Sequence, residues 1–499
     1  MLARVLSCAT IGIEGVFVAV EADLGTGLPT FTIVGLPDAA VRESRERVLA
    51  AIRNSGVEFP ARKITINLAP AHVRKEGGRF DLPIAVAVLL ASGQIPRGDP
   101  VDDGVFVGEL ALDGTVRGVR GTLAVLAAAR REGLGPVWLP RVNAAEARAV
   151  PGVGIHPIAS LRSLRGDDEI EPADLPPADS HAAPDPELDL ADVRGQLAPK
   201  RVLEIAAAGG HNVLLIGPPG AGKTMLAQRL PGILPPLGDD EAIEVSTIHS
   251  VAGRLPPGSG LIRRPPFRAP HHSISSTGLL GSTRAPGEIS LAHRGVLFMD
   301  ELPEFRRDAI EAMRQPLEEG TVTITRAGGS ISFPASVMLV TAMNPCPCGQ
   351  GAGRACRCPE REVARYRAKL SGPMLDRMDI VIEVPAVPMQ DLFLAGAREP
   401  SRVVRERVLA ARALAGRRNP AACRNAGLTA RDLARVAPLD PGSRDILSRA
   451  VERLGLTVRG AIRTRRVART IADLAGAALV LDRHVAEALQ FRMPGETRP

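Results

Sequence analysis

The feature that most constrains the fold is a glycine-rich stretch, NVLLIGPPGAGKT, at residues 212–224. The apolar residues before the glycines predict a short buried strand, and MLAQRL after them predicts a helix. Between them stands G-x-x-x-x-G-K-T, the pattern with which backbone N–H groups surround phosphate oxygens in a strand–loop–helix context. The helix N-terminus adds a dipole that favours an anion. The stretch therefore predicts a phosphate-binding loop in an α/β domain.

This loop predicts a site for ATP and Mg²⁺. Lys223 is expected to contact the β- and γ-phosphates, and Thr224 is expected to bind Mg²⁺. The residues predicted to hold the nucleotide are Gly217, Pro218, Pro219, Gly220, Ala221, Gly222, Lys223, Thr224 and Asp300.

Two later apolar runs end in polar side chains that can complete such a site. In VLFMDE, residues 296–301, Asp300 is expected to bind Mg²⁺ through water, and Glu301 to polarise the attacking water. In VMLVTAMN, residues 337–344, Asn344 is placed to hold that water or to contact the γ-phosphate. A strand-end Asn before Pro is also a common turn former. Asn344 therefore indicates a nucleotide site only together with the phosphate loop and the strand that ends in Asp300.

Length and composition predict several domains. A chain of 499 residues with 45% hydrophobic residues is too long for one ordinary core. We expect an N-terminal α/β domain at 1–164, an acidic Pro-rich linker at 165–188, the nucleotide-binding core at 189–387 and an all-helical domain at 388–499.

Local patterns predict individual elements within these domains. Strands are expected at VFVAVEADL, FTIVGL and KITINLAP, and helices at AAVRESRERVLAAIRNSG and FDLPIAVAVLLASG. VFVGELALDGTVRG predicts a hairpin that turns at Asp113-Gly114. EEGTVTITRAGGSISF, residues 318–333, predicts a second hairpin with Arg326 near its tip.

Charge is distributed unevenly along the chain. The net charge is +7, and residues 401–499 hold twenty Arg against nine acidic side chains. A basic region of this kind is either a solvated helical face or a surface for nucleic acid or another polyanion. No apolar run reaches the length of a membrane span. We expect a cytoplasmic protein without a membrane partner.

Four of the six cysteines fall within MNPCPCGQGAGRACRC, residues 343–358. Cys346, Cys348, Cys356 and Cys358 form two C-x-C pairs that can close a tetrahedral, structural Zn²⁺ site. The alternatives are two disulfides or unbound thiols, and a reducing cytoplasm disfavours disulfides. The C-x-C spacing departs from the more usual C-x-x-C zinc knuckle, and Zn²⁺ is the ligand that we predict.

Several long motifs resemble known proteins. The motifs are DLADVRGQ (189–196), PFRAPHHSIS (266–275), PGEISLAHRGVLFMDELPEF (286–305), MRQPLEEGTVTITRAGG (313–329) and SGPMLDRMDI (371–380). They resemble the magnesium-chelatase-like branch of AAA+ ATPases. KITINLAPAHVRKEGGRFDLPIAVAVLLASGQIP (63–96), the cysteine cluster and VARTIADLAG (467–476) narrow the resemblance to the YifB/ComM family, whose competence members are implicated in DNA branch migration.

The resemblance implies a multidomain α/β fold and further site residues. It implies a Lon-protease-like (S5-like α+β) N-terminal domain, a three-layer AAA+ P-loop core and an all-α lid. Arg377 in LDRMD resembles the arginine finger that reaches a neighbour's γ-phosphate, and Arg459 resembles the second sensor on the lid. The family usually has Ser-Ala-Arg where this chain has Thr457-Val458-Arg459. An arginine finger that acts on the nucleotide of a neighbouring subunit implies a homo-oligomeric ring, commonly a hexamer.

The Lon-like resemblance does not extend to proteolytic residues. A Ser-Lys dyad needs both a nucleophile and its base. KEGGRFDLPIA, where the Ser would lie, has no Ser, and TVRGVRGTLAVLAAARREG, where the Lys would lie, has no Lys. We therefore expect a non-proteolytic accessory domain.

Together these features predict a ring-forming ATPase motor that acts on branched or single-stranded DNA, with helicase or branch-migration activity in recombination or transformation. Two other functions stay open. One is a magnesium-chelatase-like metal-insertion subunit, which the ATPase motifs also fit. The other is a protein-remodelling unfoldase, which the missing dyad does not exclude.

Overall fold

A computed structural model describes residues 1–96, 98, 101–165, 188–256, 259–326, 329–351, 356–370, 372–387, 398–420 and 423–492. The chain divides into two compact units. The first contains residues 1–184, 238–262 and 283–285, and the second contains residues 185–237, 263–282 and 286–499. Most of the predicted linker lies outside the described residues, so the linker and the predicted domain limits remain predictions.

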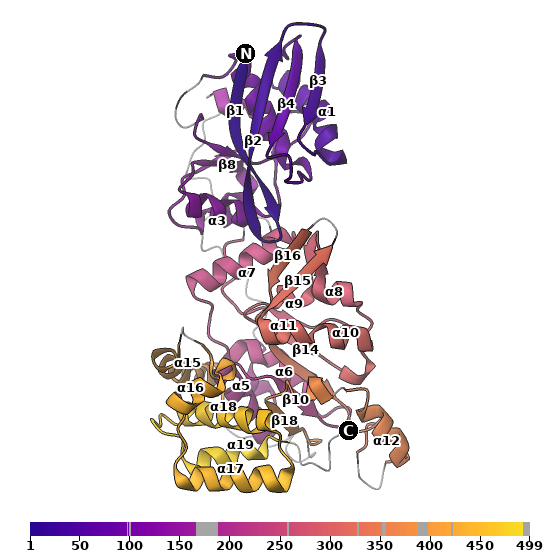
Figure 1. The fold of residues 1–499 in the computed structure, drawn as a ribbon, viewed down its shortest axis with the longest axis vertical. Coiled ribbons are helices and arrows are strands. Elements are labelled where there is room, and N and C mark those ends of the chain that lie inside the picture. Colours follow the sequence, from indigo (N-terminus) through magenta and orange to yellow (C-terminus); the bar gives the residue numbers. More distant parts are fainter. Residues whose placement is uncertain are drawn as a thin grey trace. The chain divides into compact units, whose positions relative to one another are not determined.

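The first unit is built on a mixed seven-stranded sheet (Figure 1). Its strand order is β3-β4-β2-β1-β5-β8-β9. β1 and β2 pair antiparallel over ten residues each, and β5, β8 and β9 run parallel. The strands are β1 (Leu2–Ile11), β2 (Glu14–Gly25), β3 (Thr30–Val34), β4 (Lys63–Ala69), β5 (Val105–Phe106), β8 (Val137–Pro140) and β9 (Ile155–Ile158), with a separate hairpin of β6 (Glu109–Leu110) and β7 (Val116–Arg117).

Helices complete the core of the first unit. They are α1 (Ala39–Asn54), α2 (Asp81–Ala91), α3 (Thr122–Glu132), α4 (Ala144–Arg148) and α7 (Asp239–Val251). Every residue of α2 is buried, including Asp81, because the helix is apolar all round and lies in the interior of the unit. The Asp81 carboxylate accepts a hydrogen bond from Arg47 Nε at 2.6 Å, so its charge is paired.

The α7 segment belongs to the first unit although it lies, in sequence, within the predicted nucleotide-binding core. α7 packs against α3, and the Ser250 hydroxyl donates to the Glu146 carboxylate at 3.0 Å. The backbone N–H of Gly121 donates to the carbonyl of Ser250 at 3.2 Å. Burial raises the pKa of Glu146, while hydrogen bonds from Asn143 and Ser250 lower it. These contacts join residues 238–262 to the N-terminal fold.

The second unit is built on a sheet of five strands that all run parallel. Its order is β11-β14-β17-β10-β18. The strands are β10 (Val213–Ile216), β11 (Phe267–Arg268), β14 (Val296–Met299), β17 (Met338–Met343) and β18 (Ile380–Glu383). Parallel strands put all their carboxyl ends at one edge, where ligands bind in sheets of this kind. The elements that flank the sheet include α5 (Leu197–Gly209), α6 (Lys223–Ile233), α8 (Ser276–Leu280), α9 (Glu288–Leu291), α10 (Arg307–Ala312), α11 (Arg314–Glu319), α12 (Glu360–Arg367) and α13 (Gly372–Leu375), with short pairs β12–β13 (Gly281–Ser282, Ala285–Pro286) and β15–β16 (Thr321–Arg326, Gly329–Pro334).

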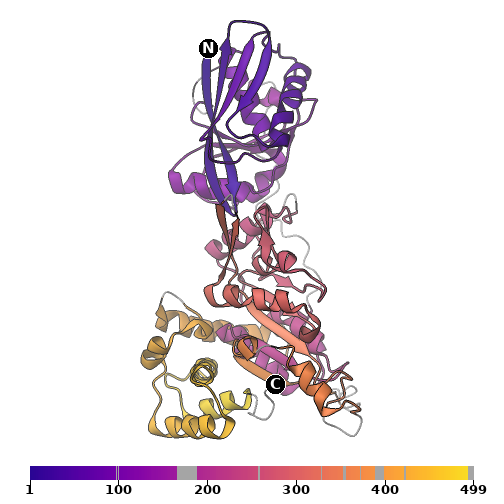
Figure 2. The same ribbon diagram turned by 45° about the vertical axis from the view of Figure 1, so that its right-hand side comes forward.

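The C-terminal part of the second unit is helical, and Figure 2 shows its orange-to-yellow helices gathered beside the sheet. They are α15 (Ser401–Arg418), α16 (Ala430–Val436), α17 (Pro441–Leu454), α18 (Val458–Leu474) and α19 (Asp482–Gln490). Val213 of the sheet, Val404 of α15 and Val467 of α18 lie in one hydrophobic cluster. The helical domain therefore shares a core with the sheet.

The structure confirms the local predictions that fall on described residues. The expected strands, the two expected N-terminal helices and the hairpin at Asp113-Gly114 are present. β15 and β16 form the second hairpin, while the side chain of Arg326 and the turn at 327–328 lie outside the described residues. The sequence did not predict β1, β8, β9, β11 or β18. No helix among the described residues combines the length and the apolarity that crossing a bilayer requires.

The assignment of α7 to the first unit predicts the result of a core substitution. Ile248 is fully buried, so Ile248→Ala should lower the stability of the first unit by about 2–5 kcal/mol. Trp138, the only tryptophan of the chain, lies in that unit and stacks on Phe106, so urea denaturation followed by its fluorescence measures the effect. Asp240→Ala, at an exposed position of the same helix, should change stability by less than about 0.5 kcal/mol. An unchanged Trp138 transition in Ile248→Ala would show that α7 does not support this unit.

Candidate functional site

The phosphate loop follows β10 and leads into α6, as the sequence predicts. Gly217 begins the loop where the chain passes close to the end of β18, and a Cβ there would lie 2.3 Å from the carbonyl oxygen of Val384. Gly220 and Gly222 adopt φ of 77° and 89°, a left-handed conformation that glycine adopts without steric cost. The loop conformation therefore depends on the glycines of the motif.

Lys223 lies at the start of α6 and is mostly buried. Its ammonium donates to the carbonyls of Gly217 at 2.6 Å and Pro218 at 3.0 Å, and to Asn344 Oδ1 at 3.1 Å. Burial lowers its pKa, and the charges of Asp300 and Glu301 act against that shift. The lysine and the strand-end Asn thus meet at one place, which supports their joint assignment to a γ-phosphate.

The residues predicted to bind Mg²⁺ are in contact. The Thr224 hydroxyl donates to Asp300 Oδ2 at 2.6 Å. Oxygen ligands of this kind, an alcohol and a carboxylate beside a phosphate loop, suit Mg²⁺. The donor set therefore fits the metal that the motifs imply.

Glu301 follows Asp300 at the end of β14 with an unusual backbone. Its φ of 52° is left-handed, a conformation that costs a non-glycine residue free energy and that occurs at functional sites. Its N–H donates to Asp300 Oδ1 at 2.9 Å. Its carboxylate is half exposed and lies 3.7 Å from Nδ1 of His272. The turn thus directs Asp300 toward Thr224 and Glu301 toward His272.

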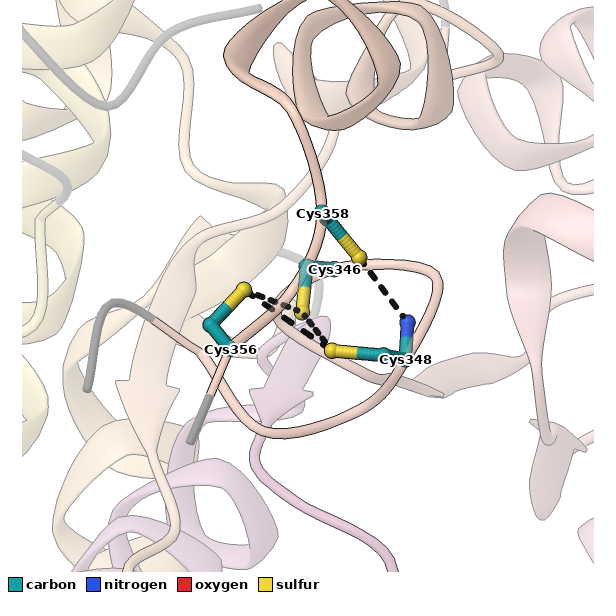
Figure 3. A group of neighbouring side chains, drawn as sticks. All are labelled: Cys346, Cys348, Cys356 and Cys358. Carbon is teal, nitrogen blue, oxygen red and sulfur yellow. Dashed lines mark hydrogen bonds between the residues drawn. The ribbon is translucent and has the colours of Figure 1, made fainter. Parts of the chain in front are cut away.

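The four clustered cysteines converge on one point, as Figure 3 shows. Their ligand atoms all lie within 4.8 Å of one another, and three Sγ–Sγ distances are 3.4, 3.7 and 3.7 Å. Tetrahedral Zn²⁺ with Zn–S bonds of about 2.3 Å holds its sulfur atoms about 3.8 Å apart. The geometry and the donor set fit Zn²⁺.

The cysteine loop touches the nucleotide site. Gly349, between the two cysteine pairs, has φ of 81° and packs on the phosphate loop, where an added Cβ would lie 2.6 Å from Cδ of Pro219. After the second pair, α12 brings Tyr366 to the backbone of Asn344. Burial raises the pKa of Tyr366 to about 12, although the Asn344 hydrogen bond lowers it. The cluster therefore supports both Pro219 and Asn344.

Arg377 lies at the opposite edge of the sheet. It precedes β18, and its carbonyl accepts a hydrogen bond from Asn212, the residue before β10. The guanidinium donates to the carbonyl of Arg314 at 3.2 Å and pairs with Glu318, and the side chain is only 10% exposed. The structure therefore does not bring Arg377 to the phosphate loop of its own chain.

Arg459 lies in the first turn of α18 and is exposed. Within the described residues, no hydrogen bond or ion pair joins it to the phosphate loop or to the carboxylates of the site. Its assignment as a sensor of the nucleotide remains a prediction.

Comparisons with known proteins cover nearly the whole chain. Three family models match: "Magnesium chelatase, subunit ChlI" at residues 189–392, "Subunit ChlI of Mg-chelatase" at 20–143 and "Magnesium chelatase, subunit ChlI C-terminal" at 398–492. YifB of Salmonella typhimurium is 44% identical over 498 residues, which is 98% of this chain and 97% of that protein. Competence protein ComM of Haemophilus influenzae is 43% identical over 500 residues, again 98% and 97%.

The chain belongs to the YifB/ComM family of magnesium-chelatase-like proteins. Membership confirms the family predicted from the motifs and identifies an AAA+ ATPase that uses ATP and Mg²⁺. A Lon protease of Mycolicibacterium smegmatis is 29% identical over 150 residues, 29% of this chain and 19% of that protein.

For this YifB/ComM protein the sequence reading missed His272. β11 is only two residues long and gives almost no strand signal, so the sequence alone did not place His272 beside the end of β14. β11 is the sheet neighbour of β14, so the chain that follows it passes beside the end of β14. His272 also packs edge-on against Phe305, 6.4 Å between ring centroids, which fixes it beside Glu301.

The contact between His272 and Glu301 predicts an effect on catalysis. A histidine that orients the carboxylate affects the attacking water more than ATP binding, so His272→Ala should lower kcat about ten- to a hundredfold with little change in ATP Kd. Steady-state ATPase kinetics and binding of a fluorescent ATP analogue measure the two quantities. Arg306→Ala, at an exposed position whose side chain pairs with Asp308, is the control. Equal loss of kcat in both variants would contradict the role.

Proposed function

We propose that chains of this protein assemble into a ring, of six in the arrangement commonest for this class, with ATP hydrolysed between neighbours. The proposal rests mainly on one observation, the position of the site residues at opposite edges of the sheet. Lys223, Asp300 and Asn344 follow the carboxyl ends of their strands, whereas Arg377 precedes the amino end of β18. The strands between these edges are four to six residues, or about 13–20 Å, long. This separation supports a role for Arg377 at a neighbour's nucleotide rather than at its own.

Each residue has a distinct role in the proposed reaction. Lys223 and the loop N–H groups bind the β- and γ-phosphates, and Thr224 and Asp300 hold the Mg²⁺ that neutralises phosphate charge. Glu301, oriented by His272, polarises the attacking water. Asn344 fixes the γ-phosphate end of the site.

In this proposal two arginines act on the transferred phosphate from other parts of the assembly. Arg377 of the next subunit stabilises charge that develops on the γ-phosphate. Arg459 approaches from the lid once the nucleotide is bound.

DNA is the polyanion that we propose as the substrate of the motor. A competence protein is among the relatives, and residues 401–499 are strongly basic. The β15–β16 hairpin is a candidate element for contacting a strand in the ring. A metal-insertion subunit or a protein unfoldase would share the ATPase site, so the preference for DNA rests on the competence relative and the basic C-terminal region.

The N-terminal unit is proposed to be a Lon-like accessory without protease activity. Its mixed sheet supports an α+β fold, and a Lon protease is among the proteins to which the chain is similar. Casein turnover by the purified protein would contradict this role.

Zn²⁺ is proposed to bind the four cysteines and to hold their loop on the phosphate loop. The sulfur spacing supports the metal, and the contact of Gly349 with Pro219 supports the coupling to the nucleotide site. Such a site is closed by four protein ligands and is structural rather than catalytic.

DNA should stimulate ATP hydrolysis and bind in a salt-dependent, sequence-independent way. ATPase rates with and without a four-way junction, a fork and single strands measure the stimulation, and the loop variant Lys223→Ala is the control for contaminating ATPases. If about six phosphates are contacted, DNA affinity should fall about a thousandfold between 50 and 200 mM salt. Indifference of both rate and binding to every DNA structure would contradict the DNA motor.

Purified protein should contain one zinc per chain, and loss of that zinc should weaken ATP binding. Elemental analysis of wild type and Cys346→Ser measures the metal, and titration with a fluorescent ATP analogue measures the affinity.

Gly349→Ala tests the contact between the cysteine loop and Pro219 independently of metal binding. Its Cβ would collide with Pro219, so it should weaken ATP binding while zinc is retained. Gly416→Ala, whose Cβ in α15 meets nothing within 4 Å, should leave both unchanged. Zinc-free wild-type protein with normal ATP affinity would contradict the proposal.

A further inference from the structure

A buried polar network lies behind Arg377 and involves none of the residues assigned above to hydrolysis. Asp379, two residues after Arg377, is 4% exposed. Its Oδ2 accepts hydrogen bonds from His211 Nδ1 at 3.3 Å and from the N–H of Asn212 at 3.3 Å. Burial acts to raise the pKa of Asp379, but His211 and nearby arginines hold it below its ordinary value. A charged carboxylate is thus kept inside the protein at the amino edge of the sheet.

The lid supplies most of the other contacts to this segment. Thr470 of α18 lies 2.7 Å from the other nitrogen of His211, which is fully buried. Arg463 of α18 lies 3.5 Å from Asp379 Oδ1. Arg492, beyond α19, donates to the carbonyls of Met378 at 3.0 Å and Asp379 at 3.1 Å. The backbone directly after Arg377 is therefore held by side chains of the lid.

The network continues within the lid and makes Thr470 part of a rigid set. Asn425 donates to Thr470 Oγ1 at 3.1 Å and to Asp473 Oδ2 at 2.8 Å. Asp473 also accepts hydrogen bonds from Arg418 at 2.6 Å and Arg469 at 2.9 Å. Buried hydrogen-bond networks of this kind restrict side-chain positions.

The same helix carries the arginine that we assign to the nucleotide. Arg459, Arg463 and Thr470 lie at spacings of four and seven residues, so they share one face of α18. A shift of α18 that follows nucleotide binding at Arg459 must therefore also act on Asp379 and His211.

We propose that His211 and Asp379 transmit the position of the lid to Arg377, so that each subunit's own nucleotide state sets the arginine it offers to its neighbour. The proposal rests on the shared site described under Proposed function. Asp379 and His211 are positioning residues, because neither touches the phosphates. Asn212 completes the connection, since its amide binds both the carbonyl of Arg377 at 3.1 Å and the N–H of Leu339 at 2.9 Å.

Mixing two inactive variants tests the proposal. Arg377→Ala retains its phosphate loop and Glu301 but supplies no arginine to its neighbour. Glu301→Gln binds ATP and cannot hydrolyse it, but it still supplies Arg377 to its neighbour. Mixtures should regain ATPase activity, because Glu301→Gln subunits complete the sites of Arg377→Ala neighbours.

The decisive mixtures carry a second substitution in the donor. Asp379→Asn added to Glu301→Gln should reduce the regained activity at least about fivefold at ATP concentrations that saturate the donor. Asp445→Asn, at an exposed lid position, is the matched donor control and should restore activity fully. Thr470→Val, which removes the hydroxyl that contacts His211, Asn425 and the carbonyl of Arg466, provides a second donor if Asp379→Asn lowers the melting temperature.

The outcomes distinguish two ideas. One is the relay, meaning the transmission from the lid through His211 and Asp379 to Arg377, and the other is the ATP site shared between subunits. Full restoration by folded Asp379→Asn and Thr470→Val donors would overturn the relay and leave the shared site intact. No restoration by Glu301→Gln alone would overturn the shared site and the relay together. Donors that no longer bind ATP or no longer assemble with their neighbours would show a general structural defect and would likewise overturn the relay.

Discussion

The parallel direction of five strands is the constraint on which the rest of this structure depends. It places the phosphate loop, Asp300 and Asn344 at one edge of the sheet, where Lys223 contacts Asn344 and Thr224 contacts Asp300. It also places Arg377 and Asp379 at the other edge. No side-chain rotation exchanges residues between the edges. A reaction that needs both sets of residues therefore needs two copies of the chain.

The two edges have different surroundings. At the nucleotide edge, the cysteine loop supports Pro219 and Asn344, so a bound metal would stiffen the residues that contact phosphate. At the other edge, lid side chains enclose Asp379, and the lid shares a hydrophobic core with the sheet. Changes in the lid are thereby connected to Arg377 through buried hydrogen bonds, which are strong because water does not compete for them.

Much of this arrangement can be predicted from the sequence, because glycine-rich loops and apolar strands are local signals. The phosphate loop, the strand ending in Asp300 and Glu301, and the converging cysteines lie as their motifs predict. His272 could not be predicted, since a two-residue strand has no periodicity. The inclusion of α7 in the first unit and the burial of His211 against Thr470 were also missed, because both depend on residues far apart in sequence.

The central claim is that one chain alone holds an incomplete site. Specific ATPase activity per chain, measured over a wide range of protein concentration beside sedimentation velocity on the same samples, tests it most directly. Activity per chain is expected to rise with concentration in step with assembly and then to level off. Full turnover by the monomer at the lowest concentration would contradict it.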